Sequence, residues 1–399
     1  AADIGVIIAC TRVGRQTLPE ETVPAQTETE DTQPEETKGP DEPVSTAIIL
    51  STGDLLMHKK VIDSGKQEDG SYDFSSIFRY IAPYVRQADY AVANLETTLC
   101  GTDNGYAYSG NPKFNCPDAI VDSAREAGFD MLLTANNHSL DTGLTGYKRT
   151  VQTVREKGLE TLGTYLTPEE RKWTAIDVNG IRLGLLCYTY SDGFNQSGKP
   201  VLNYNEMTEN GILNYFTYDK LPEFYQQIET YLKEMQASGV EATILFIHWG
   251  TEYQLGPDAN QSAMAQALCN LGIDAIIGGH PHVVEPMDLL SSATDPEHKT
   301  VVLYSLGNAV SNQRKEEIKS RPTGETEDGM LYTLTFGKYQ DGTVKIDAAE
   351  VIPTWVNMNG NLGPTEYPIV PLIAGQSDTW ASSFNLTDTQ LINAKASLN

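Results

Sequence analysis

Six short apolar runs, most of them separated by segments with helical periodicity, constrain the fold of this chain most strongly. Each run has four or five residues, which suits a buried strand and is too short for a core helix. The runs are residues 47–50, 90–93, 131–134, 243–247, 274–278 and 301–305. The helical segments are expected at 76–88, 117–128, 143–158, 221–238 and 258–272. This alternation predicts an α/β fold with mostly parallel central strands.

Four other segments read as hairpin strands with no helix between them, at 172–189, 283–289, 330–337 and 343–356. We expect them to form a second, more antiparallel sheet. Two sheets with helices outside predict a four-layer α/β/β/α sandwich. Residues 191–219 have no period and many Asn, Gly and Tyr, which indicates a long surface loop of the kind that often serves function.

The charge of the chain limits its partners. Its 28 Lys and Arg residues stand against 54 Asp and Glu residues, a formal net charge of −26. Sequence-independent binding to nucleic acid needs cations that displace counterions, so we expect no nucleic-acid partner. No apolar run approaches the roughly 18 residues of a transmembrane helix, so any membrane association would need an anchor.

Residues 7–10, Ile-Ile-Ala-Cys, resemble the lipobox of bacterial lipoproteins, in which the cysteine receives the lipid. We therefore expect residues 1–10 to be the remnant of a lipoprotein signal with Cys10 as lipid anchor. The acidic Thr/Glu/Pro segment 11–45 is expected to be a disordered linker. This places the protein on the extracellular face of the bacterial cytoplasmic membrane. The alternative is an ordinary signal fragment or an isolated cysteine.

The remaining cysteines give one open question. Cys100 and Cys116 flank a loop rich in Gly, Asn and Tyr, and a disulfide between them is plausible in an oxidising compartment. Cys187 and Cys269 lie in apolar runs and are expected to be buried thiols. No CxxC pair is present, which excludes a zinc ribbon.

Polar residues follow almost every predicted strand at its carboxyl end, where open α/β sheets bind ligands. These residues are Asp54, His58, Asn94, Glu96, Asn136, Asn137, His138, His248, His280, His282 and Asn308. They include five of the six histidines of the chain. Imidazole, carboxylate and amide oxygen together suit Zn, Mn or Fe better than Ca. The pattern predicts a metal site or a polar active site, although any one of these residues alone would more often be structural.

Six motifs occur in a fixed order: GD (53–54), NLE (94–96), NNHSLDTG (136–143), HWG (248–250), GGHPH (278–282) and YSLGN (304–308). In this order they resemble the CapA-type capsule-synthesis, poly-γ-glutamate accessory proteins, which are related to calcineurin-like metallophosphoesterases. The resemblance covers about residues 46–310. It implies a metallophosphoesterase-like domain at 46–357, with 358–399 as a C-terminal extension packing on it.

The resemblance also implies roles for individual residues. The implied ligands of one or two divalent metals are Asp54, His58, Glu96, Asn137, His248, His280 and His282. Glu96 would stand at the bridging position, and His280 and His282 would serve one metal each. His138 would be the catalytic histidine and Asp141 would orient it. The implied substrate-contacting residues are Asn94, Asn136, Tyr190 and Asn308.

Two motifs depart from the calcineurin-like pattern. Leu56 occupies the histidine position of the usual Asp-x-His motif, and His58 is displaced by two residues. Asn94-Leu95-Glu96 replaces the segment with the bridging aspartate. The site could therefore hold two metals, one or none.

Two functions follow from the resemblance. The first is a cell-surface protein of capsule or poly-γ-glutamate synthesis or export that is a hydrolase, using a metal-activated hydroxide on a phosphoester or an anionic polymer. The alternative is a non-catalytic, polymer-binding subunit of a membrane synthase. Tyr204, Tyr215 and Tyr218 of the loop 191–219 are candidates for a substrate wall, with ordinary packing as the other reading.

Overall fold

A computed structural model describes residues 41–103, 105–359 and 365–397. The predicted lipid anchor Cys10 and the predicted linker up to residue 40 lie outside these residues. The first strand, β1 (Ser45–Leu55), begins at the last residue of the predicted linker. Just before it, the Val44 N–H donates to the Lys338 carbonyl at 2.7 Å, so the chain is already attached to the sheet there.

The first sheet joins an N-terminal parallel half to a C-terminal antiparallel half. Its order is β17 (Ile369–Pro371), β16 (Val344–Val356), β15 (Asp328–Lys338), β1, β2 (Tyr90–Leu95), β3 (Met131–Leu133) and β4 (Glu160–Leu162). Strands β1 to β4 run parallel, and β15 pairs antiparallel with β1. The short β14 (Asn308–Val310) runs parallel to the end of β1 and brings a later segment to the same edge.

The second sheet has parallel central strands and antiparallel edges. Its order is β12 (Met287–Ser291), β13 (Lys299–Leu303), β11 (Ala275–Gly279), β10 (Ala242–His248), β6 (Ile181–Tyr190) and β5 (Thr174–Val178). The expectation that the hairpin segments share one antiparallel sheet is wrong. β5 and β12 extend this sheet, whereas β15 and β16 extend the first, because each antiparallel strand adds to the edge nearest its neighbour in the chain.

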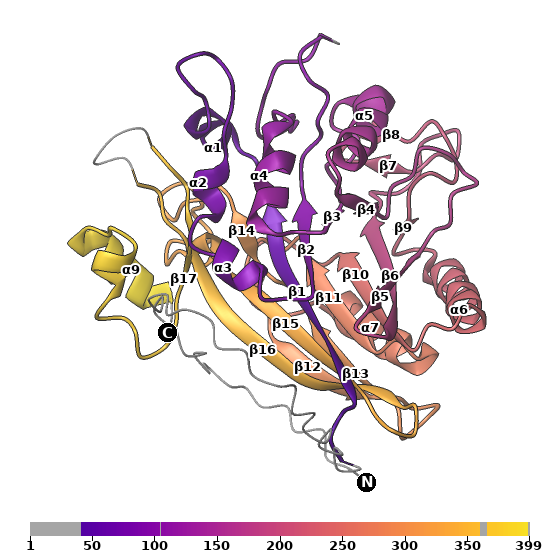
Figure 1. Cartoon of the computed structure of the whole chain (residues 1–399). Coiled ribbons are helices and arrows are strands. Elements are labelled where there is room, and N and C mark those ends of the chain that lie inside the picture. Colours follow the sequence, from indigo (N-terminus) through magenta and orange to yellow (C-terminus); the bar gives the residue numbers. More distant parts are fainter. Residues whose placement is uncertain (1–40, 104, 360–364, 398–399) are drawn as a thin grey trace, which may run out of the picture.

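The two sheets face each other across one apolar core, to which Ile49 and Val92 contribute from the first sheet and Leu185, Phe246 and Ile277 from the second. The outer face of the first sheet is covered by α1 (Lys59–Ser64), α2 (Ser75–Phe78), α3 (Ala82–Val85) and α4 (Ala119–Ala127). The outer face of the second is covered by α6 (Leu221–Ala237) and α7 (Ala259–Leu271). The predicted four-layer α/β/β/α sandwich is confirmed (Figure 1).

Three segments refine the sequence expectations. The helix expected at 76–88 is two short helices, α2 and α3. Helix α5 (Gly143–Glu156) packs Tyr147 and Val151 into the core between the sheets. The loop 191–219 carries a small hairpin of β7 (Val201–Leu202) and β8 (Asn205–Glu206), and its strand β9 (Tyr215–Phe216) pairs with β6.

The C-terminal segment adds the edge strand of the first sheet and then forms two helices. After the edge strand β17 come α8 (Trp380–Ser383) and α9 (Asp388–Ser397), drawn in yellow in Figure 1. Trp380 and Ala394 pack against Trp355, Val370 and Leu372 in a separate apolar cluster. The 3-10 helix Glu325–Glu327 precedes β15. Among the described residues, none of the helices combines the length and apolarity that a membrane span requires.

Cys100 and Cys116, the pair for which the sequence left a disulfide open, are both buried and lie in different surroundings. The Cys100 side chain faces α5, since a Cβ placed on Gly146 would lie 3.1 Å from the Cys100 Cβ. Cys116 instead packs in the apolar cluster under the outer helices, where burial raises its thiol pKa. Cys187 and Cys269 are also buried thiols, as expected.

Candidate metal centre

The strand registers bring the polar strand ends of both sheets to one place. Asp54 at the end of β1 is level with Asn94 on β2 and with Asn308 on β14. In the second sheet His248 at the end of β10 is level with Gly279 on β11. Because parallel strands end at the same edge of a sheet, these side chains converge between the two sheets.

Glu96 is the centre of this cluster. It is 0% exposed, and neither oxygen of its carboxylate has a hydrogen-bond partner among the described residues. Three imidazole nitrogens surround its Oε1, the Nε2 atoms of His248 at 3.4 Å, His282 at 3.9 Å and His138 at 4.0 Å. A buried carboxylate without donors is costly, and a bound cation would remove that cost.

Two groups of metal donors share this carboxylate. The groups are Asp54, Glu96 and His282, and Glu96, His248 and His280. Within each group the donor atoms lie within 4.8 Å of one another. Such nitrogen and oxygen donor sets fit divalent Zn, Mn or Fe. Glu96 therefore has the position that a bridging carboxylate needs.

The second group has two further features of a metal site. The Asn137 Oδ1 lies 3.0 Å from the His248 Nε2, so an amide oxygen joins this group. The Nδ1 of buried His280 has no partner in the described structure. An imidazole nitrogen buried without a partner is suited to a metal ion for the same reason as Glu96.

The loop after β11 adopts a strained conformation to present its histidines. His280 and His282 have φ angles of +97° and +57°, which non-glycine residues rarely adopt and which concentrate at functional sites. Gly279 just before them admits no side chain without crowding, since its Cβ would lie 3.1 Å from the Asp54 Oδ1. The glycine allows this backbone to approach the carboxylate closely.

A relay of amides holds Asp54. The Asn94 Nδ2 donates to the Asp54 Oδ1 at 2.7 Å. The Asn136 Nδ2 donates in turn to the Asn94 Oδ1 at 3.2 Å and to the Leu95 carbonyl at 2.9 Å. Asn94 and Asn136 were expected to contact substrate, but their amides are committed to orienting a donor.

Asn308 also supports a ligand and does not line the rim. It is 0% exposed, with its Oδ1 3.1 Å from the His282 Nδ1 and its Nδ2 donating to the His282 carbonyl at 3.2 Å. The expected substrate contact is therefore wrong for this side chain, because no surface of it is accessible. A hydrogen bond at Nδ1 leaves Nε2 to face Glu96, which is how partners of metal-binding histidines fix the ring.

His138 and Asp141 form a buried pair beside the donor groups. The His138 Nδ1 lies 2.7 Å from the Asp141 Oδ2, and the same oxygen accepts from the Phe114 N–H at 2.7 Å. The other oxygen, Oδ1, accepts from the Asn203 Nδ2 at 2.9 Å. Both Asp141 carboxylate oxygens thus accept hydrogen bonds. Asp141 therefore holds the proton on the His138 Nδ1 and turns the His138 Nε2 toward Glu96.

His58 lies near the cluster but belongs to none of the donor groups found among the described residues. Its Nδ1 accepts from the Asn312 N–H at 3.2 Å, and its ring packs edge-on against Phe114. Burial and the charge of His282 lower the His58 pKa to about 4. The structure thus places this predicted ligand in a supporting position, while Leu56 is 1% exposed in the core.

Tyr190, predicted to contact substrate, forms part of the wall of the site. Its ring lies 4.8 Å from the His280 ring and is parallel to the His248 ring at 6.4 Å. It is half-buried at the end of β6, and burial raises its phenol pKa. Two other tyrosines of the loop 191–219 have structural contacts. The Tyr218 hydroxyl accepts from the Gly250 N–H at 3.0 Å, and Tyr215 packs on the core between the sheets.

The charges of the site favour a cation. Burial alone would lower the His282 pKa, but Glu96 and Asp54 raise it to about 9. Burial would raise the Asp54 pKa, yet hydrogen bonding to His282 and the charge of His248 lower it. In the metal-free protein, the negative potential of the carboxylates is thus met by protons on imidazole, where a divalent ion would compete with them.

The sequence reading missed Glu252, an exposed residue that forms a third donor group with His280 and His282. It lies on the loop after β10, and a carboxylate so soon after a strand-end histidine was a usable signal. It also missed Phe114 and Asn203, which no sequence pattern marks because their contacts are made across the fold.

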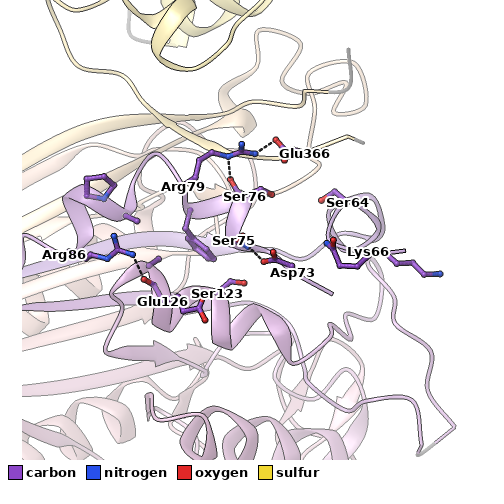
Figure 2. Close-up of a pocket in the computed structure, with 15 residues that line it drawn as sticks. Ser64, Lys66, Asp73, Ser75, Ser76, Arg79, Arg86, Ser123, Glu126 and Glu366 are labelled. Carbon is purple, nitrogen blue, oxygen red and sulfur yellow. Dashed lines mark hydrogen bonds and ion pairs between the residues drawn. The ribbon is translucent and has the colours of Figure 1, made fainter. Parts of the chain in front are cut away.

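A separate cleft of about 620 Å³ lies among α1 to α4 and the segment at Glu366 (Figure 2). None of the predicted site residues lines it. Its arginines are engaged within the protein, Arg79 with Glu366 and Arg86 with the Glu126 carbonyl at 2.6 Å. We therefore assign the chemistry to the strand-end cluster.

The family model described as "Bacterial capsule synthesis protein PGA_cap" matches residues 48–313, which include the whole strand-end cluster. The chain belongs to the PGA_cap family. Two PGA_cap relatives are named "Capsule biosynthesis protein CapA" of Bacillus anthracis, 28% identical over 264 residues, and "PGA biosynthesis protein CapA" of Bacillus subtilis strain 168, 27% identical over 263 residues. Each alignment covers 65% of this chain, and 59% and 62% of the respective relative.

Among solved structures, TT1561 of Thermus thermophilus aligns with 72% of this PGA_cap chain and 93% of its own. The TM-score is 0.38 and the sequence identity 10%. At this TM-score the likeness supports no conclusion, and the α/β/β/α architecture rests on the strand order and the apolar clusters given above.

Proposed function

We propose that this PGA_cap protein acts at the cell surface in capsule or poly-γ-glutamate synthesis or export, and that its domain is a metal-dependent hydrolase. The hydrolase proposal rests mainly on Glu96, a fully buried carboxylate that has no hydrogen bond among the described residues and is shared by two donor groups. The capsule role is drawn from the names of the two relatives. A lipid anchor at Cys10 and a membrane synthase as partner belong to the same proposal.

In such a hydrolase the site residues would have different roles. Asp54 and His282 would hold one divalent ion, His248, His280 and Asn137 the other, and Glu96 both. When bound, the ions would supply Lewis-acid activation of a phosphoryl or carbonyl group and of water. His138, with Nδ1 fixed by Asp141, would donate a proton from Nε2 to the leaving oxygen or nitrogen. Tyr190 would close one side.

The substrate we propose is a phosphoester or an amide-linked anionic polymer. The protein carries a net charge of −26, so long-range electrostatics would repel such a substrate. Its recognition would therefore depend on the local charge of the bound ions. This favours a substrate that reaches the strand-end cluster directly.

The test is turnover by the full chain after addition of Mn or Zn. The substrates are bis(p-nitrophenyl) phosphate and poly-γ-glutamate of defined chain length. We expect hydrolysis of at least one, and a loss of about 10²- to 10⁴-fold in kcat for His138→Ala with unchanged metal content. A metal-loaded parent that hydrolyses neither would overturn the hydrolase.

A second function is favoured by the altered first motif. Leu56 fills the place of a ligand with a core side chain, and His58 is held by the Asn312 N–H. A non-catalytic subunit that binds polymer for a synthase could tolerate such losses. It predicts saturable binding of poly-γ-glutamate, measured by calorimetry, without any shortening of the chains.

A further inference from the structure

A tight turn in the aperiodic loop lies against the His138–Asp141 pair. Strands β7 and β8 pair Leu202 with Asn205, so only Asn203 and Tyr204 connect them. Their φ angles are +45° and +65°. A two-residue hairpin with positive φ at both positions has the character of a type I′ turn, in which Asn is favoured first and Gly second. Tyr204 therefore occupies a position that prefers glycine.

The turn is fixed in place by its flanks. Leu202 and Met207 are both buried in the apolar core between the sheets. The Asn203 N–H donates to the Asp192 Oδ2 at 2.7 Å, and the Met207 N–H donates to the Pro200 carbonyl at 2.9 Å. The position of the turn relative to the site is thus set by packing as well as by hydrogen bonds.

The Asn203 amide is committed to the acidic partner of His138. Its Nδ2 donates to the Asp141 Oδ1 at 2.9 Å and to the Pro112 carbonyl at 3.0 Å. These bonds use both hydrogens of the amide, so its 3.3 Å approach to the His138 Nδ1 brings two donors together. Asn203 can therefore act on His138 only through Asp141, as a positioning residue.

The Tyr204 side chain is hardly packed against the rest of the protein. Its side chain is 94% exposed, the most exposed large apolar residue among those described, and its backbone is strained. A strained backbone costs stability, and such strain concentrates at functional positions. The ring stands one residue from a side chain that contacts the catalytic pair.

We propose that this turn serves the site in two ways: Asn203 positions the His138–Asp141 pair, and Tyr204 contacts a polymeric substrate that extends beyond the strand-end cluster. This rests on the proposed function. The ring offers a flat apolar face and a hydroxyl group, which suit the methylene and amide groups of a long chain. We expect a small phosphodiester held at the cluster to make no contact with this ring.

The Tyr204 part is tested with Tyr204→Asn, which suits positive φ and removes the ring. We expect the KM for long poly-γ-glutamate to rise about tenfold, the equivalent of one good contact. The kcat and KM for bis(p-nitrophenyl) phosphate should stay unchanged, and the melting temperature should be equal or higher. Ile392→Ala, which alters a side chain 68% exposed on α9, is the matched control. An unchanged KM for polymer would overturn this part.

The Asn203 part is tested with Asn203→Ala. We expect kcat to fall about 10- to 100-fold for both substrates, with KM and metal content unchanged, because the misplaced imidazole affects only the reacting step. Equal kinetics in parent and variant would overturn this part. So would a loss of metal, which would make the role merely structural.

The outcomes keep this inference separate from the proposed function. If the parent hydrolyses neither substrate, the proposed hydrolase activity is refuted. The Kd for polymer, compared between Tyr204→Asn and the parent, then tests whether Tyr204 contacts the polymer. An equal Kd would refute this contact. The imidazole Nδ1–H signal of His138 in proton NMR tests whether Asn203 positions the His138–Asp141 pair. An identical signal in the parent and in Asn203→Ala would contradict this role.

Discussion

At the residue scale, Glu96 connects the chemistry of the site to its architecture. Its Oε1 lies 3.4 Å from the His248 Nε2 of the second sheet, while its own backbone follows β2 of the first. Both oxygens lack hydrogen bonds in the described structure. A carboxylate in this position has no structural function that the fold reveals, which is why we assign it to the metals.

Glu96→Gln should therefore reduce metal binding by both donor groups. The amide keeps the shape of the side chain but loses the charge that both metals would share, so we expect metal content to fall by more than half. Unfolding should remain cooperative, because packing is preserved. Elemental analysis and thermal unfolding measure the two effects.

The control is His298→Gln. His298 lies before β13, at the opposite end of the sheet, with its Nε2 3.0 Å from the Ile273 carbonyl. Its metal content should equal that of the parent. If Glu96→Gln also retains all its metal, the shared carboxylate is not a ligand.

Gly279 provides a second prediction at this scale. In Gly279→Ala the new Cβ would lie 3.1 Å from the Asp54 Oδ1, so the Asp54 carboxylate must shift, while its 3.7 Å distance from the His248 Nδ1 is an ordinary contact. We expect metal affinity to drop about 10- to 100-fold, the usual effect of disturbing ligand orientation. Gly256→Ala, where a Cβ meets nothing within 4 Å, should leave the affinity unchanged. Competition with a fluorescent chelator measures both, and equal affinities would contradict the crowding argument.

The sequence alone indicated most of the donors, because strand ends can be recognised from short apolar runs. It could not show that Asn94 and Asn308 contact the predicted ligands Asp54 and His282, or that Asn136 contacts Asn94. These partners are distant in the sequence and are brought together by the fold. The same limit applies to His58, whose Nδ1 is taken by a backbone N–H more than 250 residues away.

At the element scale, periodicity predicted the central strands and long helices closely. It could not assign β15 and β16 to a sheet, since an apolar run carries no information about which edge it joins. It also predicted no helix in the segment after β16, because α8 and α9 have weak patterns and reach their apolar partners only through the tertiary fold.

Trp380 tests whether this C-terminal segment stabilises the domain. Its side chain is buried against Trp355 and Val370, so Trp380→Ala should cost about 3–5 kcal/mol of unfolding free energy. Metal content should not change, because none of the residues in this cluster belongs to a donor group. Denaturant unfolding measures the loss, with exposed Ile392→Ala expected to stay within about 0.5 kcal/mol. An equally small effect for Trp380→Ala would mean that the segment is not part of the cooperative unit.

At the scale of the whole molecule, stability should depend on a buried carboxyl group at the start of β15. Burial, reinforced by the charge of Glu327, raises the pKa of Asp328 from 3.8 to about 7. The folded state then holds this proton more tightly than the unfolded state. Its contribution to stability is fully present below about pH 4 and is lost as pH rises toward 7.

Asp328→Asn removes this titration. Between about pH 4 and pH 7 the unfolding free energy of the parent should fall relative to that of the variant. Chemical denaturation at several pH values measures the difference. A constant difference across this range would refute the raised pKa.

At the same scale, the strand ends of both sheets are proposed to form one metal centre around Glu96. The most direct measurement is the metal content of the purified full chain by elemental analysis, before and after incubation with Mn or Zn. We predict close to two ions per chain in the parent and less than one in Glu96→Gln. A parent that holds no metal after incubation with either ion would contradict the account.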